Sequence, residues 1–311
     1  MKWVFIDLSY LAHRARYALK DLEFEDVPTG VLFGFFEQLR TICLDPKVRS
    51  NKVAIFMDSR QSYRKKTFPG YKEGRYDKAD PEEIARRQVM WDQIRVLQTI
   101  ILPAVGVPIY RQVGLESDDL MAKAALQVTE RKQEAVMITG DHDLFQSVTG
   151  YVDWYDPQRK RLVTARNIAG DTGASASEWR EIKRLAGCSS DAVPGIPGVG
   201  EKTAIKYLSG KLPSHLKTFQ AIESPAGQRT LSLNTLLVVL PHEKTKPVEL
   251  RAPKWGSEAF FQCCEHYGLA SYLSGGRKGA WAQFFHGDCS GGKSPEGIGE
   301  RKVAAHVRKR Y

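Results

Sequence analysis

Val136-Met137-Ile138-Thr139-Gly140-Asp141-His142-Asp143 is the stretch that decides the fold, because it is an apolar run that ends in carboxylates. The same pattern occurs earlier, where Asp7 follows Val4-Phe5-Ile6 and Asp58 follows Val53-Ala54-Ile55-Phe56-Met57. Short continuous apolar runs are typical of strands buried on both faces of a parallel sheet. The carboxyl ends of such strands form the edge where ligands bind. The runs therefore predict carboxylates gathered at one edge of a sheet.

Strands and helices are expected to alternate over residues 1–165. Strands are predicted at Trp3–Asp7, Lys52–Asp58, Pro108–Tyr110, Ala135–Thr139 and Val152–Tyr155, and helices at Tyr10–Leu19, Val31–Leu44, Pro81 to about Leu102, and Ser117–Val128 with Ser117 as the N-cap. This alternation favours an α/β fold with a mostly parallel central sheet flanked by helices. We expect residues 1–165 to be a metal-binding domain with an arch at about 60–80.

The chain changes character after residue 165. Helices are predicted at Trp179–Ala186, Lys202–Leu208, Leu231–Leu240 and Ser257–Tyr267, so residues 166–273 are expected to be an all-helical region. From Ser274 onward Gly, Lys and Arg are frequent, which predicts a basic flexible tail over 274–311.

Composition restricts the class of protein. The 311 residues carry a net charge of +10, which favours an anionic partner. No apolar run approaches the roughly 18–20 residues that span a bilayer, so no membrane partner is expected. The five cysteines have neither metal-ligand nor disulfide spacing, which favours a reducing cytoplasm.

A further acidic group, Glu116-Ser117-Asp118-Asp119, begins a predicted helix and would join the carboxylates after the strands. Like charges at short range repel, and hard divalent cations such as Mg²⁺ relieve the repulsion by accepting oxygen ligands. Two such ions about 3.5–4 Å apart can promote phosphodiester hydrolysis. Any one of these carboxylates alone could be a turn residue, an N-cap or a complement to a helix dipole. Their convergence favours a metal site.

Gly198-Val199-Gly200-Glu201-Lys202-Thr203-Ala204 marks a loop that becomes a helix. Glycines let backbone N–H groups approach a ligand, and a helix N-terminus favours phosphate. The spacing does not match a phosphate-binding P-loop. Alone, the segment could be a structural helix–turn–helix; beside the carboxylates, backbone binding of one DNA strand is the better interpretation.

Arg60 to Lys78 forms a basic segment with interleaved aromatic residues. Its cations include Arg64, Lys65 and Lys66, which can grip phosphates, and aromatic rings such as Tyr71 can stack on unpaired bases. A charge run alone is usually a solvated loop. Because this one follows Asp58, we expect an arch over the acidic edge that suits a single-stranded substrate.

Six motifs resemble one family. They are Phe5–Ala15, Phe56–Asp58, Tyr71-Lys72-Glu73-Gly74-Arg75, Leu115–Asp119, Thr139–Gln146 and Ser190–Ala204. In this order they resemble the 5′-nucleases: bacteriophage 5′-3′ exonucleases, flap endonucleases and the 5′-nuclease domain of bacterial DNA polymerase I. The resemblance covers roughly residues 2–270 and implies a PIN-like fold with a helix–three-turn–helix element of the helix-hairpin-helix type.

The resemblance also implies roles for individual residues. Asp7, Asp58, Glu116, Asp118 and Asp119 would surround a first metal, and Asp141, Asp143 and Asp191 a second. Lys72 and Arg75 would contact the scissile phosphate, and Arg14 would hold substrate nearby. Duplex DNA would bind at the hairpin, which would make residues 166–273 a DNA-binding region. The DNA contacts would come from Gly195, Gly198, Gly200, Lys202 and Thr203, and carbonyl groups of the hairpin would hold K⁺.

The implied protein is a monomeric Mg²⁺-dependent 5′-3′ exonuclease and flap endonuclease, with Mn²⁺ as a substitute, in bacterial or bacteriophage replication or repair. Its substrates would be DNA with 5′ flaps, gaps or free 5′ ends, and a polymerase or a single-strand binding protein is a candidate partner. Two rivals stay open: removal of RNA primers from RNA–DNA hybrids by the same site, and a non-catalytic structure-specific DNA-binding protein. A structural protein with solvated acidic loops would show no metal effect.

Two positions depart from the family's pattern, Gly-Asp-x-x-Asp-Asn-x-Pro-Gly. Cys188 stands at its first aspartate and Ala192 at its asparagine. Cysteine is a poor ligand for Mg²⁺, which prefers oxygen. We therefore expect a weaker second metal site and an altered balance of exonuclease and endonuclease action.

Overall fold

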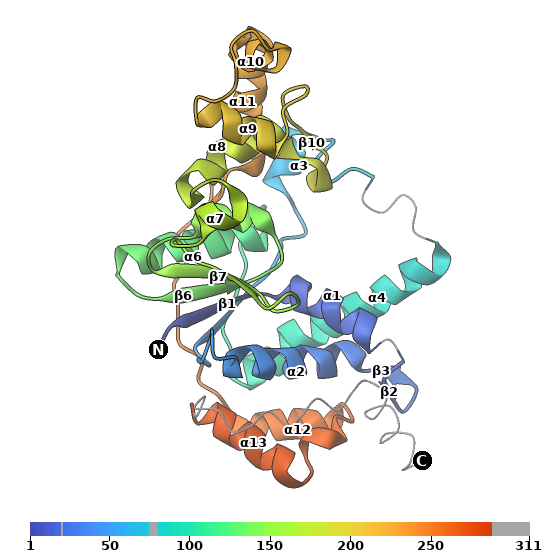
Figure 1. Ribbon diagram of the computed structural model, residues 1–311. Coiled ribbons are helices and arrows are strands. Elements are labelled where there is room, and N and C mark those ends of the chain that lie inside the picture. The colour runs from blue at the N-terminus through green and yellow to red at the C-terminus, as the bar shows by residue number, and fades with distance from the viewer. Residues whose placement is uncertain (20, 75–79, 288–311) are drawn as a thin grey trace. The chain divides into compact units, whose positions relative to one another are not determined.

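The structure is a computed structural model that describes residues 1–19, 21–74 and 80–287. In this part of the chain a six-stranded sheet has the strand order β5-β4-β1-β6-β7-β8 (Figure 1). The strands are β1 Trp3–Asp7, β4 Val53–Phe56, β5 Ile109–Tyr110, β6 Ala135–Ile138, β7 Val152–Asp156 and β8 Arg161–Val163. β6 and β7 pair in parallel, with Ala135 opposite Val152, whereas β8 pairs with β7 antiparallel. The predicted mostly parallel α/β fold is confirmed; β8 was not predicted.

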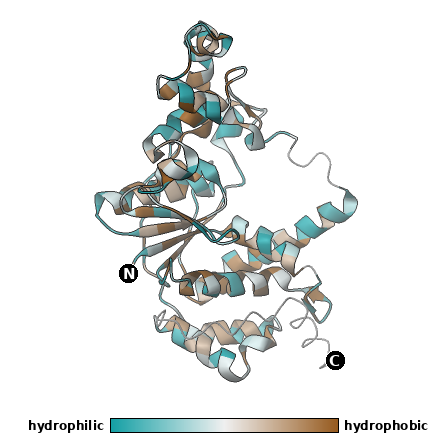
Figure 2. Ribbon diagram, in the orientation of Figure 1, coloured by the Kyte–Doolittle hydropathy of each residue, from teal (hydrophilic) through white to brown (hydrophobic). Residues whose placement is uncertain are grey.

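The strands form where the apolar runs were found. Residues of β1 and β6 are buried almost throughout, and Figure 2 shows hydrophobic residues along these strands. Each run has the length of an ordinary strand and is followed by a polar residue. Burial on both faces removes the alternation that would mark a half-exposed strand.

The chain divides into two compact units. The first unit contains residues 1–55, 81–109 and 251 onward, and the second contains 56–80 and 110–250. The predicted boundary at residue 165 assumed that neighbours in sequence stay in one unit. It differs from this division because the chain leaves the first unit after residue 55 and returns to it at 81 and again at 251.

The first unit carries mainly helices around β1. They are α1 Leu8–Ala18, α2 Gly30–Leu44, α4 Pro81–Val96, the π-helical η1 Leu97–Ile101, α5 Leu102–Ala104, α12 Ser257–His266, η4 Ala270–Tyr272 and α13 Gly275–Phe285, with the short pair β2 Glu23–Phe24 and β3 Val27–Pro28. Asp7 is the N-cap of α1, since its Oδ1 accepts from Ser9 N–H at 2.8 Å. Gln93 of α4 accepts from Val31 N–H at 2.8 Å and so satisfies the N-terminus of α2.

Helix α13 corrects the predicted flexible tail. Trp281, Phe284 and Phe285 are buried, and the Trp281 ring lies 4.7 Å from that of Phe260 in α12. Glycines near the start of α13 suggested a flexible segment, but three aromatic residues at helical spacing supply enough apolar area to fold it. The remainder of the predicted tail, from residue 288, lies outside the described residues.

The second unit surrounds β6, β7 and β8. Its helices are α3 Tyr63–Thr67, α6 Ser117–Glu130, η2 His142–Ser147, α7 Ile168–Thr172, α8 Ala176–Ala186, η3 Ser189–Asp191, α9 Glu201–Leu208, α10 Lys217–Glu223 and α11 Pro225–Val238. The prediction of an all-helical region was wrong at β9 Gly187–Cys188 and β10 Val193–Pro194, which pair antiparallel across η3. These strands are too short to show a period in the sequence.

The N-cap of α6 is Glu116, not Ser117 as predicted. The Asp119 carboxylate accepts from Glu116 N–H at 3.1 Å. This bond from the third residue of the helix makes Glu116 the N-cap, one residue before the predicted position. Among the described residues, no helix combines the length and apolar character needed to cross a membrane.

Candidate active site

The first acidic group in the second unit lies where α6 begins. Asp58 follows β4, and its Oδ1 accepts from Ser117 N–H at 2.8 Å. This hydrogen bond holds Asp58 beside the helix N-terminus that carries Glu116 and Asp118. Three predicted ligands from two segments therefore converge, and the helix dipole stabilises their negative charge.

Tyr71 and Lys72 contact this group from the basic segment. Lys72 Nζ lies 2.9 Å from Glu116 Oε1, and the Tyr71 hydroxyl lies 2.9 Å from Glu116 Oε2 and 3.0 Å from Asp191 Oδ2. Burial and then Glu116 raise the pKa of Tyr71, so the phenol stays protonated as a donor. Tyr71 therefore links a predicted ligand of the first metal to one of the second.

The second acidic group follows β6. Asp141 accepts from Asp143 N–H at 2.8 Å, and Asp143 Oδ1 lies 2.8 Å from the ammonium of Lys183. Burial would lower the pKa of Lys183, but Asp143 outweighs it and the pKa is raised. Although Asp141 reaches the surface, desolvation by the surrounding protein and then repulsion from Asp143 raise its pKa to about 6. Carboxylates are crowded here, and one buried cation partly neutralises them.

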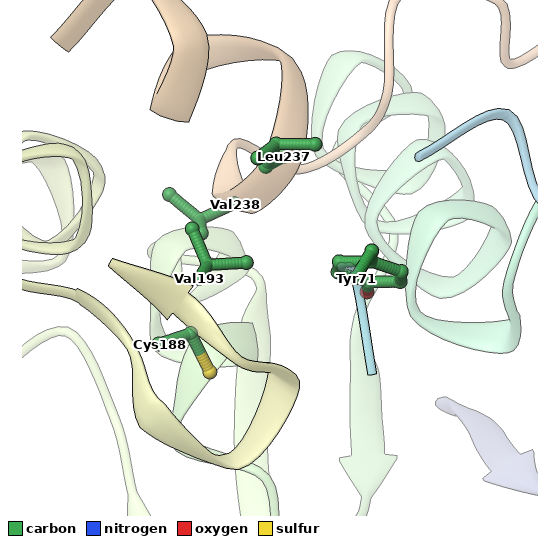
Figure 3. Packing of buried hydrophobic residues seen from close by; sticks show 5 residues of the cluster. All are labelled: Tyr71, Cys188, Val193, Leu237 and Val238. Carbon is green, nitrogen blue, oxygen red and sulfur yellow. The ribbon is translucent and has the colours of Figure 1, made fainter. Parts of the chain in front are cut away.

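Cys188 and Asp191 complete this group from the β9–η3 turn. One ligand atom each from Asp143, Cys188 and Asp191 lies within 4.8 Å of the others, so the three could hold a metal ion. Figure 3 shows Cys188 beside Val193 in the apolar cluster that also includes Tyr71. Burial and then Asp143 raise the pKa of the Cys188 thiol to about 11.

Two predicted DNA contacts, Arg64 and Tyr71, are buried instead. Only 2% of Tyr71 is exposed, because its ring packs with Leu237 and Val238 (Figure 3). Arg64 is 3% exposed and points its guanidinium at Asp119. Neither side chain is placed to stack on a base or grip a phosphate, which corrects both predictions.

Asp119 also departs from its predicted place. It is fully buried, and Arg64 binds both of its oxygens, at 2.6 and 2.7 Å. Burial alone would raise the pKa of Asp119, but the Arg64 hydrogen bonds outweigh it and hold the pKa below its ordinary value. The structure thus separates Asp119 from the more exposed Asp118.

The other predicted DNA contacts of the second unit lie largely at the surface. Lys65, Lys66, Gly198, Gly200 and Lys202 are exposed, and Thr203 is half-buried. Gly200 is the N-cap of α9, so its neighbours present free backbone donors at a helix start.

Gly195 is the exception in the hairpin. A Cβ on this residue would meet the Ala186 carbonyl oxygen at 2.2 Å. The glycine is thus required for close packing against α8, and a DNA contact is not its evident role.

Two predicted site residues belong to the first unit, and a third is not described. Asp7 and Arg14 belong to the first unit, where Asp7 caps α1 and Arg14 lies over the Tyr10 ring at 5.6 Å. Arg75 lies outside the described residues.

Lys183 is the charged site residue that sequence reasoning missed. It is 8% exposed, as measured on its side chain, and also lies 3.4 Å from Glu201 of α9. The signal was its place on the apolar face of α8, four residues after the buried Trp179. A lysine at an inward position needs a buried partner.

Comparison with known proteins identifies the family. A family model described as the 5′-3′ exonuclease, N-terminal resolvase-like domain, matches residues 2–173, more than half of the chain. DNA polymerase I of Mycobacterium tuberculosis is 31% identical over 249 residues, which cover 77% of this chain and 26% of that protein. The 5′-3′ exonuclease of Buchnera aphidicola is 26% identical over 207 residues, covering 66% and 69%. This chain thus spans about a quarter of the polymerase relatives.

Solved structures share the fold. The bacteriophage T5 D15 protein co-crystallised with metal ions has a TM-score of 0.64 at 18% identity, covering 78% of this chain and 90% of that one. Human GEN1 in complex with Holliday junction DNA has a TM-score of 0.53 at 16% identity, covering 86% and 68%. With the family model extending from β1 past β8, this chain belongs to the family that carries the 5′-3′ exonuclease N-terminal resolvase-like domain.

Proposed function

We propose that this chain is a divalent-metal-dependent 5′-nuclease that hydrolyses phosphodiester bonds in DNA with 5′ flaps, gaps or free 5′ ends. One observation carries the proposal: carboxylates from separate segments of the second unit gather around Lys72 and Tyr71, in a member of a 5′-3′ exonuclease family. Related folds bound to DNA and metal ions support it.

The first acidic group fits Mg²⁺. Asp58, Glu116 and Asp118 offer only oxygen donors, which this ion prefers. Asp7 remains a predicted ligand of the same ion. A second Mg²⁺ would use Asp141, Asp143 and Asp191, beside the poorly suited thiol of Cys188. Bound ions would activate water and stabilise the leaving oxygen.

Lys72 is the residue that we propose to act on the phosphate. Its ammonium is partly exposed and already lies among carboxylates, 2.9 Å from Glu116. Donation from this ammonium to a phosphate oxygen would stabilise the charge that develops in the transition state. Tyr71 would hold the Glu116 and Asp191 carboxylates at fixed positions while Lys72 donates to the phosphate.

The surface residues would hold the nucleic acid without reading its sequence. Lys65 and Lys66 would contact phosphates of the single strand. The start of α9, with Gly198, Gly200 and Lys202, would bind the duplex backbone, where K⁺ is a proposed additional ion. We propose that the protein is a cytoplasmic monomer. We also propose that it works with a polymerase, since a matching segment occurs in proteins named DNA polymerase I.

The test is cleavage of a 5′-labelled flap duplex in Mg²⁺, Mn²⁺ or EDTA. Asp118→Asn should lower the rate by more than about 100-fold, since even outer-shell changes cost 10–100-fold. Glu130→Gln, an exposed change at the other end of α6, is the matched control and should keep the rate. A parallel substrate with an RNA flap compares the two nucleic acids. Tight flap binding without cleavage in either metal would favour a non-catalytic DNA-binding protein.

A further inference from the structure

A buried ion pair lies at the base of the basic segment. Arg64 of α3 and Asp119 of α6 form a bidentate pair, with Nη1–Oδ2 at 2.6 Å and Nη2–Oδ1 at 2.7 Å. Both side chains are almost completely removed from solvent. This planar two-bond geometry fixes orientation as well as distance.

The Asp119 carboxylate is saturated by donors. Besides the two bonds from Arg64, its Oδ1 accepts from His242 N–H at 2.8 Å and its Oδ2 from Glu116 N–H at 3.1 Å. An ionised carboxylate has about four lone-pair positions. Four donors occupy them, so Asp119 has none to offer a metal ion.

The pair joins four segments of the second unit. Arg64 Nε also donates to the Leu237 carbonyl at 2.7 Å, which adds the end of α11 to α3, α6 and the turn at His242. Next to it, Tyr63 N–H donates to the Gly114 carbonyl at 2.9 Å, and the Tyr63 ring stacks on His242 at 5.8 Å. The base of the basic segment is therefore anchored to the helix start that carries the acidic group.

The anchor bears on the active-site geometry. A few residues beyond α3, Tyr71 and Lys72 contact Glu116, the residue whose N–H is held by Asp119. A shift of α3 relative to α6 would move Lys72 relative to its carboxylates. A misplacement of about 1 Å in a reacting group can lower a rate about 100-fold.

We propose that Arg64 and Asp119 form a positioning pair that sets Lys72 against the acidic group, and that neither residue binds metal or DNA. The proposal rests on the proposed nuclease function for its effect on rate. It assigns Asp119 a role opposite to that of its neighbour Asp118, a predicted ligand.

A structural role of the ion pair can be distinguished from metal binding by Asp119, because a pair of apolar side chains can replace the ion pair. Removing one partner leaves a buried charge, so Asp119→Leu alone should lower Tm by roughly 10 °C. The double variant Arg64→Met/Asp119→Leu should regain part of that loss, since well-packed apolar side chains often replace a buried ion pair at no cost. It should not regain all of it, because the His242 and Glu116 N–H groups lose their acceptor. Its Kd for Mg²⁺, from calorimetric titration without DNA, should stay within about 3-fold of wild type, whereas Asp118→Asn should weaken it at least about 10-fold.

Arg64→Lys tests the positioning itself. Lysine keeps the charge but loses the fork geometry. Measured well below its Tm at saturating Mg²⁺, this variant should cleave the flap duplex at least about 10-fold more slowly with an unchanged Kd for Mg²⁺. Arg86→Lys, in the exposed pair with Glu82, is the matched control and should change neither value.

Each result decides a different claim. If the double variant binds Mg²⁺ as weakly as Asp118→Asn, then Asp119 is a ligand and the proposal fails. An unchanged cleavage rate in folded Arg64→Lys would leave a purely structural pair and refute the positioning role. Absence of cleavage by the wild type would refute the proposed function instead, while the Tm and Mg²⁺ titrations would still decide whether Asp119 binds metal.

Discussion

Replacing Cys188 with aspartate should strengthen the Mg²⁺ binding that we propose for the second acidic group. The change puts a third carboxylate beside Asp143 and Asp191, whose ligand atoms lie within 4.8 Å of the Cys188 sulfur. At 4.8 Å and an effective dielectric constant of about 20, each new repulsion is worth roughly 3.5 kcal/mol. The Lys183 ammonium, whose charge already acts on position 188, should offset about one of the two repulsions.

The expected result therefore depends on the metal. In EDTA, Cys188→Asp should lose roughly 3 kcal/mol of stability, a decrease in Tm of about 6–12 °C. When Mg²⁺ is present, the added carboxylate can bind the ion, which relieves the repulsion between the carboxylates. The Kd of the more weakly bound Mg²⁺ should therefore fall at least about 10-fold, or 1.4 kcal/mol. Because a ligand that binds only the folded state raises Tm, the Mg²⁺-induced increase in Tm should exceed that of the wild type.

The assay is a thermal melt and a calorimetric titration over a Mg²⁺ series, with Cys188→Ser as the control. Serine removes the thiol without adding charge, so it should show neither the loss in EDTA nor the gain in Mg²⁺. If the Cys188→Asp and Cys188→Ser titrations coincide, the added carboxylate does not reach an ion. The assignment of Cys188 to the metal group would then be wrong.

Three further predictions concern stability. Ala192 has a left-handed backbone with φ of 56°, so Ala192→Asn, which suits that conformation, should stabilise the protein by roughly 1 kcal/mol in urea unfolding, and Ala192→Val should not. Trp281→Ala should cost roughly 3–5 kcal/mol in the same assay, whereas a flexible tail would lose nothing. The pKa of Asp141 is raised from 3.8 to about 6, so the folded state holds this proton more tightly than the unfolded state does. In EDTA, the stability of the protein should therefore fall as the pH rises from 3.8 to about 6. Asp141→Asn should remove this pH dependence from thermal melts recorded over the same pH range.

The strands could be predicted because their signal is local. An apolar run of four or five residues ending in a carboxylate is visible without tertiary contacts, and β1, β4 and β6 appear where such runs occur. Helix α13 could not be predicted from its glycines and cations, because it folds only when Trp281 meets the aromatic residues of α12. The two-unit division escaped prediction for the same reason: it follows contacts between residues distant in the chain, such as the bond from Asn51 to the Phe284 carbonyl, 233 positions away.

The candidate site shows a sharper limit. A motif indicates which segment carries the chemistry, but consecutive residues on a helix point about 100° apart, so their surroundings differ completely. Asp118 and Asp119 are the same residue type in the same motif, so the sequence does not distinguish them. In the structure, Asp119 faces Arg64, and donors occupy all of its acceptor positions. Arg64 and Lys65 diverge in the same way, one buried and one exposed. A charged residue is expected at the surface by default, and only a partner distant in the chain makes its burial favourable. The acidic motif therefore places a proposed ligand, Asp118, directly beside Asp119, a buried carboxylate that four donors hold.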